Sequence, residues 1–172
     1  MLIIHHAQGQ YGMKLIKPEH PRVGGIHRMA IWLSQTTPQS LNEMGKATLL
    51  SHLGIEFLEI GEDFLKARMP VDHRTITPFG ILHGGASAAF AETLGGIAAS
   101  LCVDRKKKLC VGLEINANHV RPAKQGFVYG TAKPIHMGNF TQVWEIRIHN
   151  EEDDLVCISR LTVAIINKEE DS

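Results

Sequence analysis

The chain has 172 residues, of which 44% are hydrophobic and 21% are charged, a composition typical of one globular domain with its own core. Its 18 basic residues balance its 18 acidic residues, so electrostatics gives no reason to expect a nucleic-acid partner. The three cysteines form no CxxC pair, and the ten histidines have no metal-ligand spacing. The sequence therefore predicts no metal, no disulfide framework and a reducing, cytoplasmic location.

Residues 1–28 differ in composition from the rest of the chain. They are rich in His, Gly and Pro and have no periodicity, which predicts a poorly ordered extension before a domain at residues 29–172. They also lack the extended apolar region of a secretory signal. Residues 80–103 are long enough to cross a membrane, but they contain His83 and Glu92, and their apolar residues are mostly Ala and Gly. A core helix, with no membrane partner, is the better interpretation.

The first part of the domain predicts two helical segments and two strands. Thr37 and Pro38 are typical of a helix start, and Gly45 is typical of a helix end. A second, short helical turn is expected at residues 48–53. Turn residues around Gly61 then separate two short strands, at residues 55–60 and 64–69.

The second part predicts one long helix followed by strands. A polar loop at residues 71–78 leads to a helix from about Ala86 to Leu101. Trp144, Ile146 and Ile148 alternate with polar neighbours, so one face of the sheet is expected to be apolar. The strands are expected at residues 109–120, 127–136, 141–150 and 155–167. This order indicates an α+β fold, in which an antiparallel sheet wraps around one long central helix.

Residues 78–92, PFGILHGGASAAFAE, combine groups that suit carbonyl chemistry. Glu92 is the one acid in an apolar segment, where we expect it to be at least partly buried and either paired or used. It is a candidate nucleophile or general base. Gly84 is a candidate backbone donor to an oxyanion, because it precedes the predicted helix, and His83 is placed to assist. The alternatives are a buried acid satisfied by its neighbours, a structural histidine, and glycines that only shape a turn.

The residues three and four positions from Glu92 along the predicted helix are all small: Ala88, Ala89, Gly95 and Gly96. Each helical glycine costs about 1 kcal/mol relative to alanine, so the pair requires a reason. One reason is room beside the carboxylate for a ligand. The other is close packing of the helix against the sheet or another helix, and both interpretations remain open.

Three segments carry a resemblance to a known family. VDHRTITPFGILHGGASAAFAETLGG, VGLEINANHVRPAKQG and KPIHMGNFTQVWEI resemble the hotdog-fold acyl-CoA thioesterases of the PaaI-like group, and the similarity runs from about Ile31 to Ile166. The resemblance implies a hotdog fold and a homodimer or homotetramer with active sites at the dimer interface. It also implies an acyl-CoA substrate and no cofactor, since coenzyme A is part of the substrate.

The resemblance also implies roles for individual residues. Glu92 falls on the catalytic carboxylate, His83 beside the thioester, and Gly84 on the amide that polarises its carbonyl. Two positions depart from the pattern: Thr77 stands where a glutamine is usual, and Gly96 where Ser or Thr is usual, so Thr93 is expected to take over the latter function. The implied substrate contacts are Thr77, Gly85, Asn118, His119, Val120, Arg121, His136, Met137, Gly138 and Asn139. For Arg121 a solvated strand end, and for residues 136–139 a plain hairpin turn, are the structural alternatives.

The function expected from the sequence is hydrolysis of an aryl- or acyl-CoA thioester to the free acid and CoA. A hotdog enoyl-CoA hydratase or dehydratase is a second interpretation, and a non-catalytic acyl-CoA-binding module is a third. Candidate walls of the acyl pocket are Met69, Phe79, Leu82 and Phe90. The sequence does not distinguish an aromatic acyl group from an aliphatic one.

Overall fold

The computed structural model describes residues 30–168, so the expected extension at residues 1–28 lies outside the described residues. Three helices and six strands follow one another in the expected order, which confirms the fold class. Their bounds are α1 Pro38–Met44, α2 Leu49–Leu53, β1 Glu56–Ile60, β2 Leu65–Pro70, α3 Gly84–Leu101, β3 Lys108–His119, β4 Phe127–Met137, β5 Thr141–His149 and β6 Leu155–Asn167. The main difference from expectation is that α3 begins two residues earlier, at Gly84.

The two short helices form where the sequence provides caps. The Thr37 hydroxyl accepts a hydrogen bond from the Ser40 N–H at the start of α1, and Thr48 does the same for Leu50 in α2. Gly54 ends α2 at a φ of 67°, a left-handed conformation that glycine adopts without steric cost. Both caps are local, which is why the sequence alone predicts these helices.

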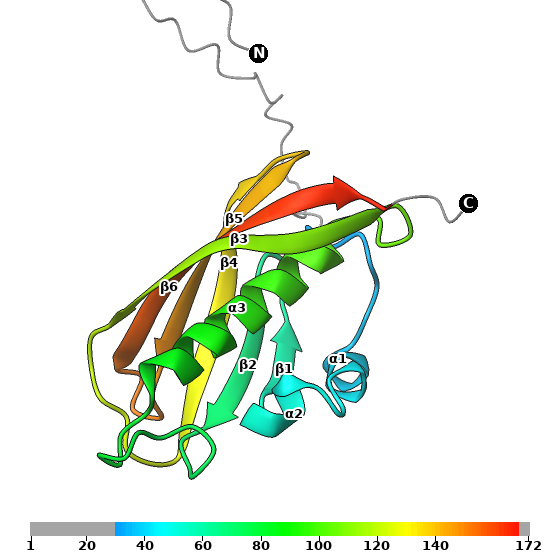
Figure 1. Cartoon of the computed structure of the whole chain (residues 1–172). Coiled ribbons are helices and arrows are strands. Elements are labelled where there is room, and N and C mark those ends of the chain that lie inside the picture. Colours follow the sequence, from blue (N-terminus) through cyan, green and yellow to red (C-terminus); the bar gives the residue numbers. More distant parts are fainter. Residues whose placement is uncertain (1–29, 169–172) are drawn as a thin grey trace, which may run out of the picture.

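All six strands form one antiparallel sheet in the order β1-β2-β4-β5-β6-β3. The sheet curves around α3, which lies across its concave face, while α1 and α2 lie beside β1 (Figure 1). The strand that follows α3 in the chain, β3, therefore forms the edge of the sheet farthest from β1. This edge is 12 residues long, whereas the β1 edge has only five.

The core fills the space between α3 and the concave face. Phe90 and Leu94 of α3 are fully buried, as are Trp144, Ile146 and Ile148 of β5. The alternation along β5 therefore runs as expected, with the apolar side chains facing the helix. None of the helices within residues 30–168 is long and apolar enough to cross a membrane.

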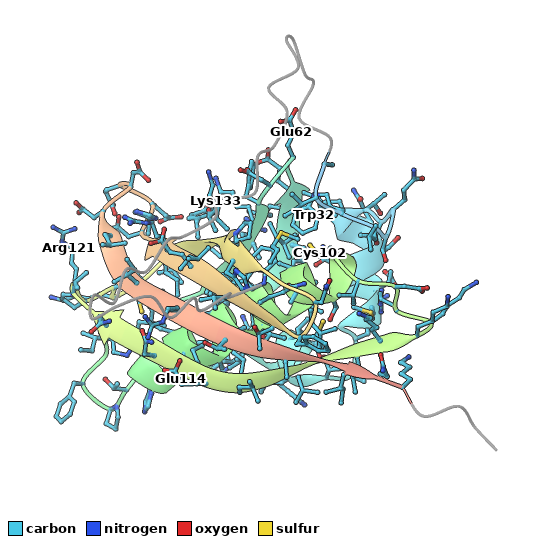
Figure 2. The ribbon with its side chains drawn as sticks, turned by 90° about the horizontal axis from the view of Figure 1, so that it is seen from above. Trp32, Glu62, Cys102, Glu114, Arg121 and Lys133 are labelled. Carbon is cyan, nitrogen blue, oxygen red and sulfur yellow. The ribbon has the colours of Figure 1, made fainter. Side chains whose placement is uncertain are left out.

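The segment before α1 closes one end of this core. The Trp32 ring stacks on that of Trp144 with centroids 6.3 Å apart, and its Nε1 donates to the Gly61 carbonyl at 2.6 Å. The Leu33 and Ser34 N–H groups both donate to the carbonyl of Leu101, the last residue of α3. Figure 2 shows Trp32 close to Cys102, the residue that follows α3. Residues 31–34 thus belong to the domain and satisfy the C-terminal end of the central helix.

The two adjacent glycines of α3 have different surroundings. A Cβ atom on Gly95 would lie 2.6 Å from Cδ2 of Leu161 and 3.3 Å from Cδ1 of Ile146, so this glycine allows the helix to approach the sheet closely. A Cβ atom on Gly96 would have no atom within 4 Å. Close packing therefore explains Gly95, and it does not explain Gly96.

We expect Gly95→Ala and Gly96→Ala to change stability in opposite directions. The first forces a methyl group into the buried Leu161 side chain, and we expect a loss of about 1–2 kcal/mol in the free energy of unfolding. The second adds a better helix former in open space and should raise stability by up to about 1 kcal/mol. Urea denaturation followed by circular dichroism measures both. Equal gains for the two variants would contradict the close contact at Gly95.

Candidate active site

The loop between β2 and α3 is fixed by one buried threonine. Thr75 is 1% exposed, and its hydroxyl donates to the Pro70 carbonyl at 2.7 Å and accepts from the Asp72 N–H at 3.1 Å. The Thr75 carbonyl in turn accepts the His83 N–H at 2.8 Å. This chain of bonds ties the residue just before α3 to the end of β2.

His83 is the N-cap of α3 and satisfies most of its first turn. Its Nδ1 accepts the Gly85 N–H at 2.8 Å, and its carbonyl accepts the N–H groups of Ala86 and Ser87. Because Nδ1 is an acceptor, the proton of the neutral imidazole is on Nε2, which is then a donor. The helix provides no acceptor for its first N–H, that of Gly84, and none of the described residues accepts it. One backbone donor at the positive end of α3 is thus left for a ligand.

A second histidine lies over the same amide. His119, near the end of β3, has its Nε2 where a Cβ atom on Gly84 would be only 2.8 Å away. A glycine at position 84 is what allows this approach. The N-terminus of α3 therefore combines a free N–H with two exposed imidazoles, His83 and His119, a set of donors suited to a carbonyl oxygen that becomes negative.

Glu92 lies near the middle of α3 and is exposed in the single chain, so the expectation of a buried acid is wrong. Burial fails because this face of α3 looks toward the edge strand β3 and not into the core. The carboxylate lies beside β3, where a Cβ atom on Gly112 would be 2.9 Å from its Oε1. Thr93 is half-buried and points about 100° away from Glu92 around the helix.

Thr77 is engaged in its own turn. Its hydroxyl accepts the Phe79 N–H at 3.2 Å, and its carbonyl accepts the Gly80 N–H. Phe79 at the tip of this turn is 89% exposed. Met69 and Phe90 are completely buried in the core, so the expectation that these two residues line the acyl pocket is wrong.

The residues that follow His119 lie at the same end of the sheet. Arg121 makes an ion pair with Asp154 at 3.0 Å, and Figure 2 shows it far from Cys102 and the C-terminal end of α3. Asn118 and Val120 are both exposed. Asn118 pairs with Ile158 of β6, and the Asn118 side chain lies on the convex side of the sheet. Only His119 of this segment faces the start of α3.

The hairpin at residues 136–139 lies at the opposite end of the sheet. It follows β4, which begins at Phe127 beside the β2–α3 loop and spans about 33 Å at 3.3 Å per residue. Within it the Gly138 N–H donates to the Thr141 carbonyl at 2.9 Å, and the His136 ring folds over Gly138. One chain therefore does not bring its hairpin residues His136, Met137, Gly138 and Asn139 together with His83.

Sequence reasoning missed several residues that shape the site. Thr75 gave no signal, because its role depends on how the loop folds. Gly112 gave none either, since the approach of Glu92 is a tertiary contact. Among the described residues, no group of three His, Cys, Asp or Glu side chains gathers closely enough to hold a metal ion.

Comparison with known proteins supports an enzymatic reading of this geometry. Residues 79–157 match the thioesterase superfamily. The 1,4-dihydroxy-2-naphthoyl-CoA hydrolase of Escherichia coli is 52% identical over 136 residues, covering 79% of this chain and 99% of the relative. The proofreading thioesterase EntH of Cronobacter turicensis is 48% identical over 136 residues, covering 79% of this chain and 98% of the relative.

A solved structure gives the same result. The crystal structure of a thioesterase from Haemophilus influenzae has a TM-score of 0.79 and 51% sequence identity, with 81% of this chain and 97% of that chain covered. The chain therefore belongs to the thioesterase superfamily and has the hotdog fold, which confirms the family predicted from the sequence. The prediction of a thioester hydrolase is confirmed with it.

The loop before α3 also gives an acid-dependent contribution to stability. Hydrogen bonds from the Arg74 side chain and backbone N–H lower the pKa of Asp72 from 3.8 to about 2. Because the folded-state pKa lies below the unfolded one, the contribution is present above about pH 4 and is lost as the pH falls toward 2. Both side chains are about one-third exposed, so we expect less than about 1 kcal/mol.

Asp72→Asn should therefore lower stability at pH 5 and become equal to the wild type near pH 2. Urea denaturation between pH 2 and pH 5 measures the difference. Arg74→Gln is the matched control, because it removes the same pair from the other side, and the double variant should cost little more than either single one. A difference that stays constant across this pH range would contradict the role of the pair.

Proposed function

We propose that the chain hydrolyses acyl-CoA thioesters to the free acid and CoA. The observation that carries this proposal is the free Gly84 N–H at the start of α3, with His83 and His119 beside it. A thioester carbonyl oxygen placed there receives hydrogen bonds that strengthen as it becomes negative. The names of the relatives, a naphthoyl-CoA hydrolase and a proofreading thioesterase, support a CoA thioester as substrate.

Glu92 is the group that performs the chemistry in this proposal. Its carboxylate attacks the carbonyl carbon or removes a proton from the water that does, and the Gly84 N–H holds the resulting oxyanion. Collapse of the tetrahedral intermediate breaks the carbon–sulfur bond and releases CoA as its thiolate, which takes up a proton. When water is the nucleophile, this step gives the acid directly; when Glu92 is the nucleophile, it leaves a mixed anhydride that a water then hydrolyses to the acid and free Glu92. Either route consumes one water for each acid formed. No metal or redox group takes part, and coenzyme A enters as part of the substrate.

Two copies of the chain are needed to assemble this site. Gly84 and Glu92 are eight residues apart on one helix, which places them about 12 Å apart along its axis. A carbonyl within about 3 Å of the Gly84 N–H is then out of reach of the same chain's carboxylate. The proposed site therefore combines Gly84 and His83 of one copy with Glu92 of another.

The edge strand β3 offers the surface for such a pairing. It is long, and no other strand within residues 30–168 pairs with its outer side. Leu109, Val111 and Leu113 are 47%, 41% and 62% exposed, and such an edge readily pairs with another chain. A two-fold axis that places Gly84 of one copy opposite Glu92 of the other passes beside residue 88, which is midway between them. Ala88 of one copy then lies next to Ala88 of the other, and this small side chain allows the two helices to approach closely. We propose a homodimer of this kind, or a homotetramer of two such dimers.

Coenzyme A binding and cellular location belong to the same proposal. In this proposal His119, which faces the start of α3, contacts the end of the pantetheine nearest the thioester. Asn118, Val120 and Arg121, at the same end of the sheet, contact the remainder of the coenzyme and its phosphates. The hairpin residues 136–139 contribute only from a neighbouring copy. The three cysteines are free thiols, which supports a cytoplasmic protein.

Gly84→Pro tests the backbone donor directly. Proline is tolerated at the first position of a helix and removes only the N–H, so we expect kcat for CoA release to fall about 100- to 1000-fold. Gly84→Ala is the matched control, because it makes the same close contact with His119 and keeps the N–H. Release of CoA from benzoyl-CoA, followed with a thiol reagent, measures both. Equal losses of kcat in the two variants would contradict the role of the Gly84 N–H as a hydrogen-bond donor.

Mixing two inactive variants tests the shared site. Glu92→Ala and Gly84→Pro should each lose most turnover while keeping the fold. When equal amounts are unfolded and refolded together, half of the dimers are mixed and each holds one intact site, so about a quarter of wild-type activity should return.

Native mass spectrometry shows whether mixed dimers have formed. If they have formed and the mixture regains no thioesterase activity, the whole site lies in one chain and the shared site is wrong. Assays with an unsaturated acyl-CoA separate hydrolysis from hydration, since only hydrolysis releases a thiol. Tight binding of the thioester without thiol release would instead indicate a binding module.

A further inference from the structure

Gly112 is a glycine inside a long strand, and its presence there needs a reason. It lies within β3, which runs from Lys108 to His119. A glycine in the interior of a strand weakens it, and such a glycine often marks a bulge or the close approach of another group. Both features occur at this position, since Glu92 of α3 approaches Gly112 and the pairing of β3 with β6 is irregular directly after it.

A side chain at position 112 would collide with the Glu92 carboxylate and with little else. A Cβ atom there would lie 2.9 Å from Oε1 of Glu92, whereas ordinary contacts of such an atom begin at 3.4 Å. The nearest atom of another residue, Cδ1 of Leu161, would be 3.9 Å away. The carboxylate is therefore the group that a methyl group at position 112 would displace.

The Glu92 carboxylate is held by this approach to β3 and not by hydrogen bonds. None of residues 30–168 donates a hydrogen bond to it or forms an ion pair with it, so its lone pairs are available to a nucleophile or general base. One helical turn further along α3, a Cβ atom on Gly96 would meet nothing within 4 Å. The strand thus limits the position of the carboxylate on one side, while the side toward Gly96 is open.

The irregularity after Gly112 is a β-bulge that changes which face of the sheet the next acid occupies. Gly112 pairs with Val163 of β6, and Glu114 pairs with the adjacent residue Thr162, so Leu113 is one extra residue in β3. Adjacent residues of a strand point to opposite faces, and Val163 is buried in the core. Gly112 therefore faces α3, whereas Glu114 is on the convex face.

The bulge keeps a second carboxylate away from Glu92. On the convex face Glu114 is exposed and accepts a hydrogen bond from Nδ2 of Asn116 at 3.2 Å. In a regular strand Gly112 and Glu114 would share a face and lie about 7 Å apart. Glu114 would then point toward α3, and a like charge close to Glu92 disfavours the ionised carboxylate that the proposed chemistry requires.

We propose that Gly112 is a positioning residue for the reaction, because its missing side chain lets the Glu92 carboxylate lie against β3 at the point from which it acts on the thioester. This inference rests on the proposed function and on Glu92 as its chemical group. A methyl group at position 112 forces the carboxylate about half an ångström or more toward the open side. Because the group that moves is the end of a flexible side chain, the fold tolerates the change, whereas the geometry of the reaction does not.

Gly112→Ala tests the inference through the separation of kcat from KM. We expect kcat for release of CoA from benzoyl-CoA to fall about tenfold and KM to change less than twofold, because the attacking group moves and the contacts with the substrate remain. The urea midpoint should not fall below that of the wild type. Circular dichroism and sedimentation velocity on the same samples show whether fold and assembly are kept.

Glu92→Asp provides the matched background for this substitution. The aspartate side chain is one methylene shorter, so its carboxylate does not reach position 112. Glu92→Asp alone should lower kcat, and adding Gly112→Ala to it should change kcat less than twofold. A loss caused by a distorted strand would instead appear in both backgrounds, which is why the double variant distinguishes positioning from a structural role.

The other outcomes overturn the inference in distinguishable ways. An equal loss of kcat in both backgrounds, or no loss in either, means that β3 does not position the carboxylate. Unfolding of Gly112→Ala, or its dissociation into monomers, means that the glycine serves the sheet or the contact between copies instead. In each of these cases the wild type still releases CoA and the proposed function stands. Failure of the wild type to release CoA from any thioester overturns the inference and the proposed function together.

Discussion

The central helix carries both chemical ends of the proposed site, and its rigidity keeps them apart. An α-helix rises about 1.5 Å per residue, so the free N–H of Gly84 and the carboxylate of Glu92 cannot converge within one chain. The helix cannot bend to bring them together, because Phe90 and Leu94 between them are fully buried against the sheet. The same constraint distinguishes the two edges of the sheet. The long, partly apolar edge β3 lies beside the face of α3 that carries Glu92, where the proposed site requires a second copy of the chain. The short edge β1 has α1 and α2 beside it.

The start of the helix is held as firmly as its middle. His83 receives its position from Thr75, and the adjacent Leu82 N–H donates to the Ala123 carbonyl at 2.8 Å. The first turn is thus attached to the loop after β2 and to the loop before β4. Donors that are already fixed need no reorganisation when charge develops on a bound carbonyl, which is the property that makes backbone amides effective in catalysis.

The sequence predicts most of the fold because its signals are local. Thr37, Thr48 and Gly54 act on the residues next to them, and the alternation in β5 needs only the period of a strand. The exposure of Glu92 could not be predicted in this way, since it depends on which face of α3 meets the edge of the sheet. The composition of the segment suggested a buried acid, whereas the topology places Glu92 beside β3, an edge strand that pairs on its outer side with no other strand of the described residues. The same reasoning applies to Thr75 and Gly112, whose roles arise only when distant segments meet.

The two departures from the family pattern differ in what the surrounding structure does with them. The Thr77 hydroxyl is used by the Phe79 N–H, so this position contributes a stable turn and no side chain that extends toward the carbonyl. In the proposed mechanism, polarisation of the thioester then depends on the Gly84 N–H together with His83 and His119, which lie at the same helix N-terminus. At Gly96 none of the described residues takes the place of the missing side chain, since a Cβ atom there would meet nothing within 4 Å. In the proposed mechanism the first departure therefore leaves the polarisation of the carbonyl to the helix N-terminus, while the second leaves an uncrowded position one helical turn from the carboxylate.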